Sequence, residues 1–181
     1  MKPERKTILV MILISIFTGC AVQKPQPTWH SQPPVQRFST DTIDIQIKPL
    51  KQNSSFYVSF ELAVHNKTPH PMEIDWNETH YIHQGKDKGL FVFKNIDPEQ
   101  FRKRTIPKET VPAGGTLIKL ISPVRTITWT KLRKTTQTDT AAFSAGILPN
   151  GSNGVSLLLS QQGHRWRQAL TVKIFEQIVG N

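Results

Sequence analysis

Cys20 is the only cysteine among the 181 residues of this chain, and its thiol is the side chain with the most distinctive chemistry. A single cysteine has no partner within the chain for a disulfide bond. It stands shortly after an apolar run, residues 8–17, which is interrupted only by Ser15. A thiol in this position can form a thioether to another molecule, so we interpret Cys20 as a point of covalent attachment.

The segment before Cys20 has the pattern of a secretory leader. Lys2, Arg5 and Lys6 make its start positive, and the ten-residue apolar run follows. As a helix that rises ~1.5 Å per residue, ten residues cover about 15 Å, which is half of a ~30 Å hydrocarbon core. We therefore expect residues 1–19 to be a cleaved signal peptide and not a membrane-spanning anchor.

The four residues FTGC, 17–20, resemble the lipobox of bacterial lipoproteins. In that family the cysteine sulfur receives a diacylglyceryl group and the chain is cut before the cysteine. The resemblance implies cleavage between Gly19 and Cys20 and a lipid anchor on Cys20, although Phe17 stands where the family prefers leucine. Ala21, in place of an aspartate, implies outer-membrane sorting with the protein facing the periplasm. The alternative is an ordinary signal peptide with an incidental cysteine.

Residues 20–40 have no apolar periodicity and contain prolines at positions 25, 27, 33 and 34. Proline-rich chains extend at ~3.1 Å per residue, so twenty residues reach up to roughly 60 Å. We interpret this segment as a linker between the lipidated cysteine and a folded domain. The alternative is that the segment is a ligand for a partner that recognises proline-rich sequences. Trp29 and Phe38 could contact either the domain or the lipid surface.

Residues 41–178 show the period-two alternation of strands that bury one face. The apolar positions of three stretches are Ile43, Ile45 and Ile47; Phe56, Val58, Phe60, Leu62 and Val64; and Leu170, Val172 and Ile174. Ser59, Glu61 and His65 are expected on the solvent face. Turn sequences recur at 66–71, 84–89, 112–115 and 148–154, and Gly163 suits a hairpin turn. Short strands between such turns predict a single all-β domain, an antiparallel β-sandwich or a barrel.

One helix is predicted, at residues 96–104. Asp97 can cap it, Pro98 suits the first helical position, and Glu99 lies at the positive end of the helix dipole. We expect one or two turns at the edge of the sandwich.

A second resemblance covers most of residues 41–178. The stretches SFELAVHNKTPHPMEIDWNETHYI, VPAGGT and NGVSLLL are similar to those of small Gram-negative lipoproteins. These carry an immunoglobulin-like sandwich, loosely shared with the desiccation-related LEA14/WHy domains. The resemblance implies an immunoglobulin-like fold and no known activity, since a sandwich hosts many functions.

No catalytic or metal-binding constellation is recognisable. His80 and His83 would point to opposite faces of a strand and could not hold one ion. Ser144 lies outside any nucleophile-elbow motif. Glu73 and Asp75 alternate with apolar residues, as on the solvent face of a strand. We therefore predict neither a metal nor a cofactor.

Trp76 is expected in the core, where its indole N–H needs a hydrogen-bond partner. Asn77 and Thr79 can turn the chain after the strand. The alternative is that Trp76, Tyr81 and Trp129 form an aromatic platform for a ligand.

Positive charge is the remaining feature that can carry function. The formal charge is +10, and removal of residues 1–19, with three basic and one acidic residue, leaves +8. The candidate binding patch consists of Arg102, Lys103, Arg104, Lys131, Arg133, Lys134, Arg165 and Arg167. A basic domain beside a membrane can bind anionic head groups or acidic polymers. Nucleic acid is not expected in the periplasm, and simple solubility is the alternative.

These observations predict a non-catalytic, lipid-anchored envelope protein. It would present an edge strand or a basic face to another envelope component. One alternative is an accessory docking lipoprotein of a secretion or conjugation machine. The other, an envelope enzyme, is disfavoured because the sequence offers no catalytic motif.

Overall fold

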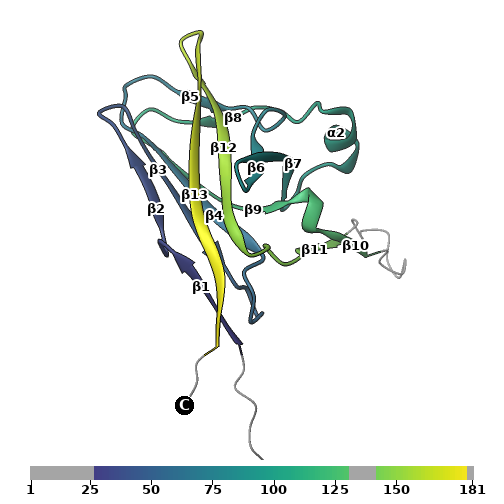
Figure 1. Ribbon diagram of the computed structural model, residues 1–181. Helices are drawn as coiled ribbons and strands as arrows, with labels where there is room; N and C mark the ends of the chain where they lie inside the picture. The colour runs from purple at the N-terminus through teal and green to yellow at the C-terminus, as the bar shows by residue number, and fades with distance from the viewer. Residues whose placement is uncertain (1–26, 131–141, 179–181) are drawn as a thin grey trace, which may run out of the picture. The chain divides into compact units, whose positions relative to one another are not determined.

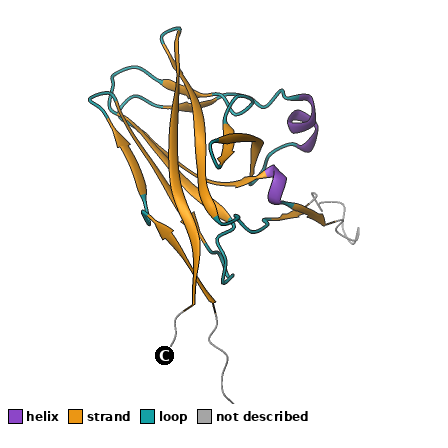
Figure 2. Cartoon of the chain, in the orientation of Figure 1, coloured by secondary structure: helices purple, strands orange, loops and turns teal. Residues whose placement is uncertain are grey.

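Antiparallel strands make up most of the part of the chain that the structure describes, residues 27–130 and 142–178 (Figure 2). The structure is a computed structural model, in which Thr28–Gln177 form one compact unit. The predicted all-β fold is therefore confirmed for this unit.

The first strands of the chain are β1 (Pro27–Gln32), β2 (Gln36–Ser39), β3 (Ile43–Leu50), β4 (Ser59–Asn66), β5 (Met72–Ile74), β6 (His80–His83) and β7 (Lys86–Phe93). Helix α2 (Pro98–Lys103) separates them from β8 (Glu109–Val111) and β9 (Thr116–Pro123). A 3-10 turn, η1 (Val124–Thr126), leads to β10 (Thr128–Thr130), and then come β11 (Ala142–Ser144), β12 (Gly151–Gln161) and β13 (His164–Ile178).

The main sheet has the strand order β1-β13-β12-β6-β7-β9-β4-β3-β2, and β5 pairs with both β12 and β8 beside this path. The two end strands, β1 and β2, are consecutive in the chain and are separated only by residues 33–35. The sheet therefore curls so that the β12–β13 layer faces the β3–β4 layer (Figure 1). This arrangement is a β-sandwich whose two layers are joined through β7, which pairs with β6 on one side and with β9 on the other.

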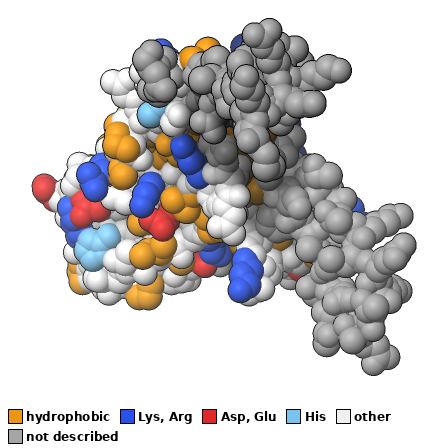
Figure 3. Space-filling view, turned by 90° about the horizontal axis from the view of Figure 1, so that it is seen from below, with side chains coloured by type: hydrophobic (Ala, Val, Ile, Leu, Met, Phe, Trp, Pro, Cys, Tyr) orange, Lys and Arg blue, Asp and Glu red, His pale blue; other side chains and the backbone are white. Residues whose placement is uncertain are grey.

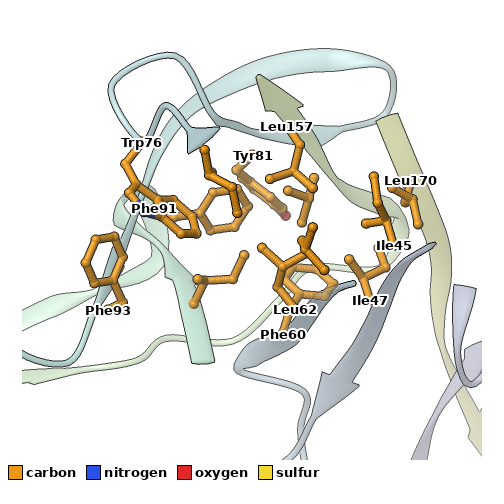
Figure 4. Packing of buried hydrophobic residues seen from close by; sticks show 14 of the residues in the cluster. Ile45, Ile47, Phe60, Leu62, Trp76, Tyr81, Phe91, Phe93, Leu157 and Leu170 are labelled. Atoms are coloured by element: carbon orange, nitrogen blue, oxygen red, sulfur yellow. The ribbon is translucent and has the colours of Figure 1, made fainter. Parts of the chain in front are cut away.

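The core lies between these layers (Figure 4). The alternation that the sequence shows is observed in β3, β4 and β13. Their inward apolar residues are buried: Ile43, Ile45, Ile47, Phe60, Leu62, Val64, Leu170, Val172 and Ile174. Each buried side chain of this size stabilises the fold by about 1.5–3 kcal/mol relative to exposure.

The predicted hairpin is formed by β12 and β13, which pair from Gly151 opposite Ile174 to Gln161 opposite His164. Gln162 and Gly163 make the turn with φ values of 50° and 80°. Two positive φ values match the twist that a two-residue hairpin requires.

The predicted helix is also present, as α2. The Asp97 carboxylate accepts a hydrogen bond of 2.8 Å from the backbone N–H of Glu99. Pro98 begins the helix, and Arg104 ends it in the left-handed conformation with φ 54°. The cap and the proline define where this short helix begins.

Two boundaries and one side-chain orientation predicted from the sequence are wrong. Residues 27–39, assigned to the linker, form β1 and β2, and Trp29 and Phe38 pack against the core. The turn expected at 84–89 is shorter because β7 begins at Lys86. Ser59, expected to face solvent, is buried, and its hydroxyl group accepts a hydrogen bond from the Gln52 amide at 2.7 Å. β1 is a strand because it pairs with β13, which is distant in the sequence, whereas the other differences involve partners nearby in the chain: β3 for β2, β6 for β7 and Gln52 for Ser59.

The small β10–β11 sheet was not predicted from the sequence. Among the described residues, no helix has the length and apolar character needed to cross a membrane.

Candidate functional site

Several predicted site residues lie outside the described ranges. They are the proposed cleavage and lipidation residues Gly19 and Cys20, and the basic residues Lys131, Arg133 and Lys134. Lipidation therefore stays a prediction, as does the part that these three basic residues play in the patch.

The other basic residues of the predicted patch lie on two elements and have acidic neighbours. On α2, Arg102 and Lys103 both contact Glu99, at 3.0 and 3.4 Å. Arg104 is the C-cap of the same helix. Near the start of β13, the Arg165 guanidinium lies 3.6 Å from the Asp75 carboxylate, and the Arg167 guanidinium lies 3.6 Å from the Glu78 carboxylate. On the face that Figure 3 shows, basic side chains are interspersed with acidic and hydrophobic ones.

His80 and His83 are the first and last residues of strand β6. His80 makes a close Nδ1–Oδ2 contact with the Asp87 carboxylate. In the described ranges, no three histidine, cysteine or acidic side chains are grouped to hold a metal ion. Ser144 ends β11, and residues 145–150 after it contain no helix.

Trp76 and Tyr81 are buried, so the hypothesis that they present an aromatic platform is wrong. The Trp76 indole donates a 2.8 Å hydrogen bond to Glu109 Oε2, which is the partner that its burial requires. The Tyr81 hydroxyl donates to the buried Asn153 amide oxygen, and burial raises the pKa of Tyr81. Both rings belong to the core (Figure 4).

The first candidate site is the open edge of β9, which we define as residues 116–120. On one side, these residues pair with β4. On the other side, β7 pairs with β9 only at residues 121–123. Within residues 27–130 and 142–178, no strand continues the sheet beyond the open edge.

The positions of the hydrogen bonds along the β4–β9 ladder show which backbone groups of β9 point away from β4. The Asn66 N–H donates to the Gly115 carbonyl at 2.9 Å, in register with the β4–β9 pairs. In an antiparallel ladder, hydrogen-bonded pairs alternate with non-bonded ones. Thr116, Ile118 and Leu120 therefore direct their N–H and C=O groups away from β4, toward the side without a strand.

The same residues carry an uncharged outer face. Ile118 is 66% exposed and Leu120 is 43% exposed, which is high for large apolar side chains. Natural edge strands usually carry a charge or a proline that discourages pairing. The outer face of residues 116–120 has neither, so main-chain and apolar groups are presented together.

Lys119 faces the inner side of β9. Its ammonium lies 2.5 Å from Glu109 Oε2 and 4.0 Å from the centre of the Phe93 ring. Glu109 also accepts the Trp76 indole N–H. The ion pair and the cation–π contact compensate for partial burial of this lysine and keep its charge away from the outer face.

The second candidate site is a cleft of about 480 Å³ on the other layer of the sandwich, which we call the hairpin cleft. It is formed by β5, β8, the loop after β4 and the β12–β13 turn. Its lining residues are His70, Pro71, Glu73, Lys108, Thr110, Ser160, Gln161, Gln162, Gly163 and Arg165. This volume lies in the range of small-molecule sites.

Glu73 and Lys108 form an ion pair in the hairpin cleft. The Lys108 ammonium donates to Glu73 Oε2 at 2.9 Å, and the Ser160 hydroxyl donates to the same oxygen at 3.2 Å. The hydrogen bond from Lys108, then that from Ser160, lowers the pKa of Glu73. Glu73 therefore stays ionised at neutral pH and neutralises part of the positive charge of the cleft.

Two amide side chains hold the walls of the hairpin cleft together. Gln161 Nε2 donates to Thr68 Oγ1 at 2.6 Å and to the His70 carbonyl at 2.8 Å. The buried Asn66 amide donates to the same His70 carbonyl at 2.7 Å and to the Val111 carbonyl at 3.2 Å. The loop after β4 is thereby tied both to the hairpin and to β8, so the cleft is preformed.

The chain matches no protein-family model, no curated protein and no solved structure.

Sequence reasoning identified neither candidate site. Arg165 was assigned to the basic patch, and Glu73 was assigned to a solvent face, but nothing local indicates that they line one cleft. For the open edge of β9, the available signal was LIKLI, residues 117–121, which has apolar residues in both alternating positions. Such a pattern leaves one apolar set without a core to enter.

Proposed function

We propose that this chain is a non-catalytic, lipid-anchored envelope protein whose β-sandwich docks an extended segment of another envelope protein. The lipid anchor would be Cys20 and the membrane would be the outer membrane, with the domain on its periplasmic side. The docking surface would be the open edge of β9. Residues 1–19 would be removed as a signal peptide.

The observation that carries this proposal is the coincidence of two properties at Ile118 and Leu120. Their backbone groups point toward a side on which no described strand pairs, and their side chains are exposed and apolar. A strand added at this edge would satisfy the backbone groups and would cover the two side chains at the same time. Main-chain hydrogen bonds supply affinity in this mode, and the alternate side chains supply specificity.

Site-directed photocrosslinking in intact cells tests the docking surface. A photoreactive residue at position 118 is expected to give one discrete crosslinked adduct. The matched control is position 171, because Thr171 is exposed on β13, a strand that pairs on both sides. No discrete adduct is expected there.

A charge placed on the edge provides the second test. With the photoreactive residue kept at 118, Leu120→Lys should abolish the adduct, because an edge lysine opposes pairing. Lys173→Gln changes charge on β13 and should leave the adduct intact. Equal adducts at 118 and 171, or persistence of the adduct in Leu120→Lys, would contradict docking at β9.

The anchor is tested separately by intact mass and membrane fractionation of the wild type and of Cys20→Ser. The wild type should carry acyl mass and sediment with outer membranes, because two or more acyl chains give stable attachment. Cys20→Ser should lose both properties. If the two proteins behave alike, Cys20 is not an anchor, and only the docking half of the proposal remains.

A further inference from the structure

The hairpin cleft is lined by the positively charged side chain of Arg165, which makes no close hydrogen-bonded ion pair among the described residues. Among the described residues, the carboxylate nearest to the Arg165 guanidinium belongs to Asp75, at 3.6 Å. This separation is longer than a hydrogen bond. The Arg165 side chain is 57% exposed and lines the cleft, so its planar fork of N–H donors is accessible there.

Lys108 adds a second cation to the lining of the cleft. One of its protons is directed to Glu73, and an ammonium has three donors, so two are available for a further acceptor. Within the lining, the charges of Lys108 and Arg165 exceed the single carboxylate of Glu73 by one when His70 is neutral. Asp75 lies outside the lining, 3.6 Å from Arg165, and offsets part of this positive charge. A metal cation is disfavoured, because the only lining carboxylate is already paired.

The lining of the cleft also contains uncharged hydrogen-bond donors. The Thr110 hydroxyl and the Gln162 amide line the same cleft, next to the turn at Gly163. An arginine fork binds phosphate with two parallel hydrogen bonds, and a lysine contributes a point charge. We propose that the hairpin cleft binds the phosphate group of a phosphorylated small molecule or of a phospholipid head group.

The shape of the cleft agrees with a phosphate carried by a larger body. At about 480 Å³ the cleft exceeds the size of a phosphate ion, and Pro71 and Gly163 give it walls without charge. The bracing of its walls by Asn66 and Gln161 means that little chain ordering has to accompany binding. This site lies on a different layer from β9 and does not depend on the docking proposal.

The test is a titration of the full-length chain in neutral detergent micelles with inorganic phosphate, followed by the backbone amide signals of Gly163 and Thr110. Saturable shifts of both signals are expected. Lys108→Gln and Arg165→Gln should each weaken phosphate binding by about tenfold, the effect of one charge-assisted hydrogen bond. Lys173→Gln removes an exposed charge outside the cleft and should leave the affinity unchanged within about twofold. An unchanged urea midpoint shows that each variant is folded.

A second arm distinguishes the source of the phosphate. Phosphatidylcholine vesicles with and without phosphatidic acid replace inorganic phosphate, and the same two amide signals are followed. A response to phosphatidic acid that Arg165→Gln removes assigns the cleft to a lipid head group. A response to inorganic phosphate alone assigns it to a soluble phosphate.

Two results would overturn the proposal. One is the absence of a saturable response of Gly163 and Thr110 to both probes. The other is equal weakening by Lys173→Gln and Arg165→Gln, which would show that the protein attracts phosphate only through its overall positive charge.

Discussion

Strands β4 and β9 are neighbours of equal length, eight residues each, yet they have opposite roles in the sheet. β4 pairs with β3 along its whole length and with β9 along most of it. β9 pairs with β4 at residues 116–121 and with β7 at residues 121–123, so only Ile121 has a partner on both sides. The first strand is an interior element of the fold, and the second has one free side along most of its length.

Their side chains differ in the same way. In β4 the apolar residues Phe60, Leu62 and Val64 face the core. In β9 a lysine faces inward and two large apolar residues face outward. Lys119 is stabilised in that position by its ion pair with Glu109 and by the contact of its ammonium with the face of the Phe93 ring. The comparison teaches that alternation specifies the face of a strand only where one of its two residue sets is uniformly apolar.

The largest expected effect concerns the register of β4. Phe60 is fully buried, so Phe60→Ala should lower the free energy of unfolding by about 3–5 kcal/mol through lost burial and a cavity. Glu61 lies on the opposite face, and Glu61→Ala should change it by less than about 0.5 kcal/mol. Urea denaturation measures both. Equal effects would mean that the register of β4 is shifted by one residue.

The same truncation in the two strands sharpens the comparison. Leu62→Ala in β4 should cost about 2–5 kcal/mol, because Leu62 is fully buried. Leu120→Ala in β9 should cost less than about 0.5 kcal/mol, because that side chain is exposed in the isolated protein. Thermal unfolding and urea midpoints of both variants check this. A large loss for Leu120→Ala would show that the outer face of β9 is covered within the chain.

The inward lysine of β9 should matter more than an exposed one. Lys119→Met leaves Glu109 without its cation in a partly buried place and should cost about 1–3 kcal/mol. Lys103→Met removes an exposed ion pair on α2 and should cost less than about 0.5 kcal/mol. The double variant with Glu109→Gln should lose less than the sum of the single losses. Additive losses in urea denaturation would argue against a coupled pair.

The smallest effect is a pH dependence beside β4. Asp44, which pairs with His65 of β4, accepts hydrogen bonds from Lys67 and then Ser39, and these lower its pKa below the usual 3.8. A lowered folded pKa means that the unfolded chain binds the proton more tightly. The contribution of Asp44 to stability is therefore complete above about pH 3.8 and is lost as the pH falls through its folded pKa.

Urea midpoints measured from neutral to acid pH check this, with Asp44→Asn as the comparison. The difference between wild type and variant should shrink on acidification. A constant difference would mean that Lys67 and Ser39 do not stabilise the ionised carboxylate. The outer face of residues 116–120 in β9 has no titrating side chain, so Ile118→Ala should leave the profile unchanged.

The elements that the sequence predicted well are those with short-range information. The burial of Ile43, Ile45 and Ile47 follows from period two, and the turn at Gln162 and Gly163 follows from the hairpin pattern. The start of α2 follows from Asp97 and Pro98. In all three, the residues that decide the structure are neighbours in the chain, so a local pattern is sufficient.

The elements that it missed depend on distant partners. β1 and β2 lie in a proline-rich stretch, and they are strands because β13 and β3 offer them edges. The hairpin cleft exists because β5 pairs with both β8 and β12, which brings Lys108 near a turn more than fifty residues later. No pattern within a short window contains that pairing.

By itself, the sequence determined that this protein is an all-β domain. It also determined which side chains the strands β3, β4 and β13 bury, and where α2 begins. Burial of alternate apolar side chains and capping are local causes, and they leave a local record. The tertiary structure alone decided that β9 turns Ile118 and Leu120 outward and that Arg165 and Lys108 share a cleft. These outcomes depend on which strands pair and which charges meet, and only the folded chain brings those groups together.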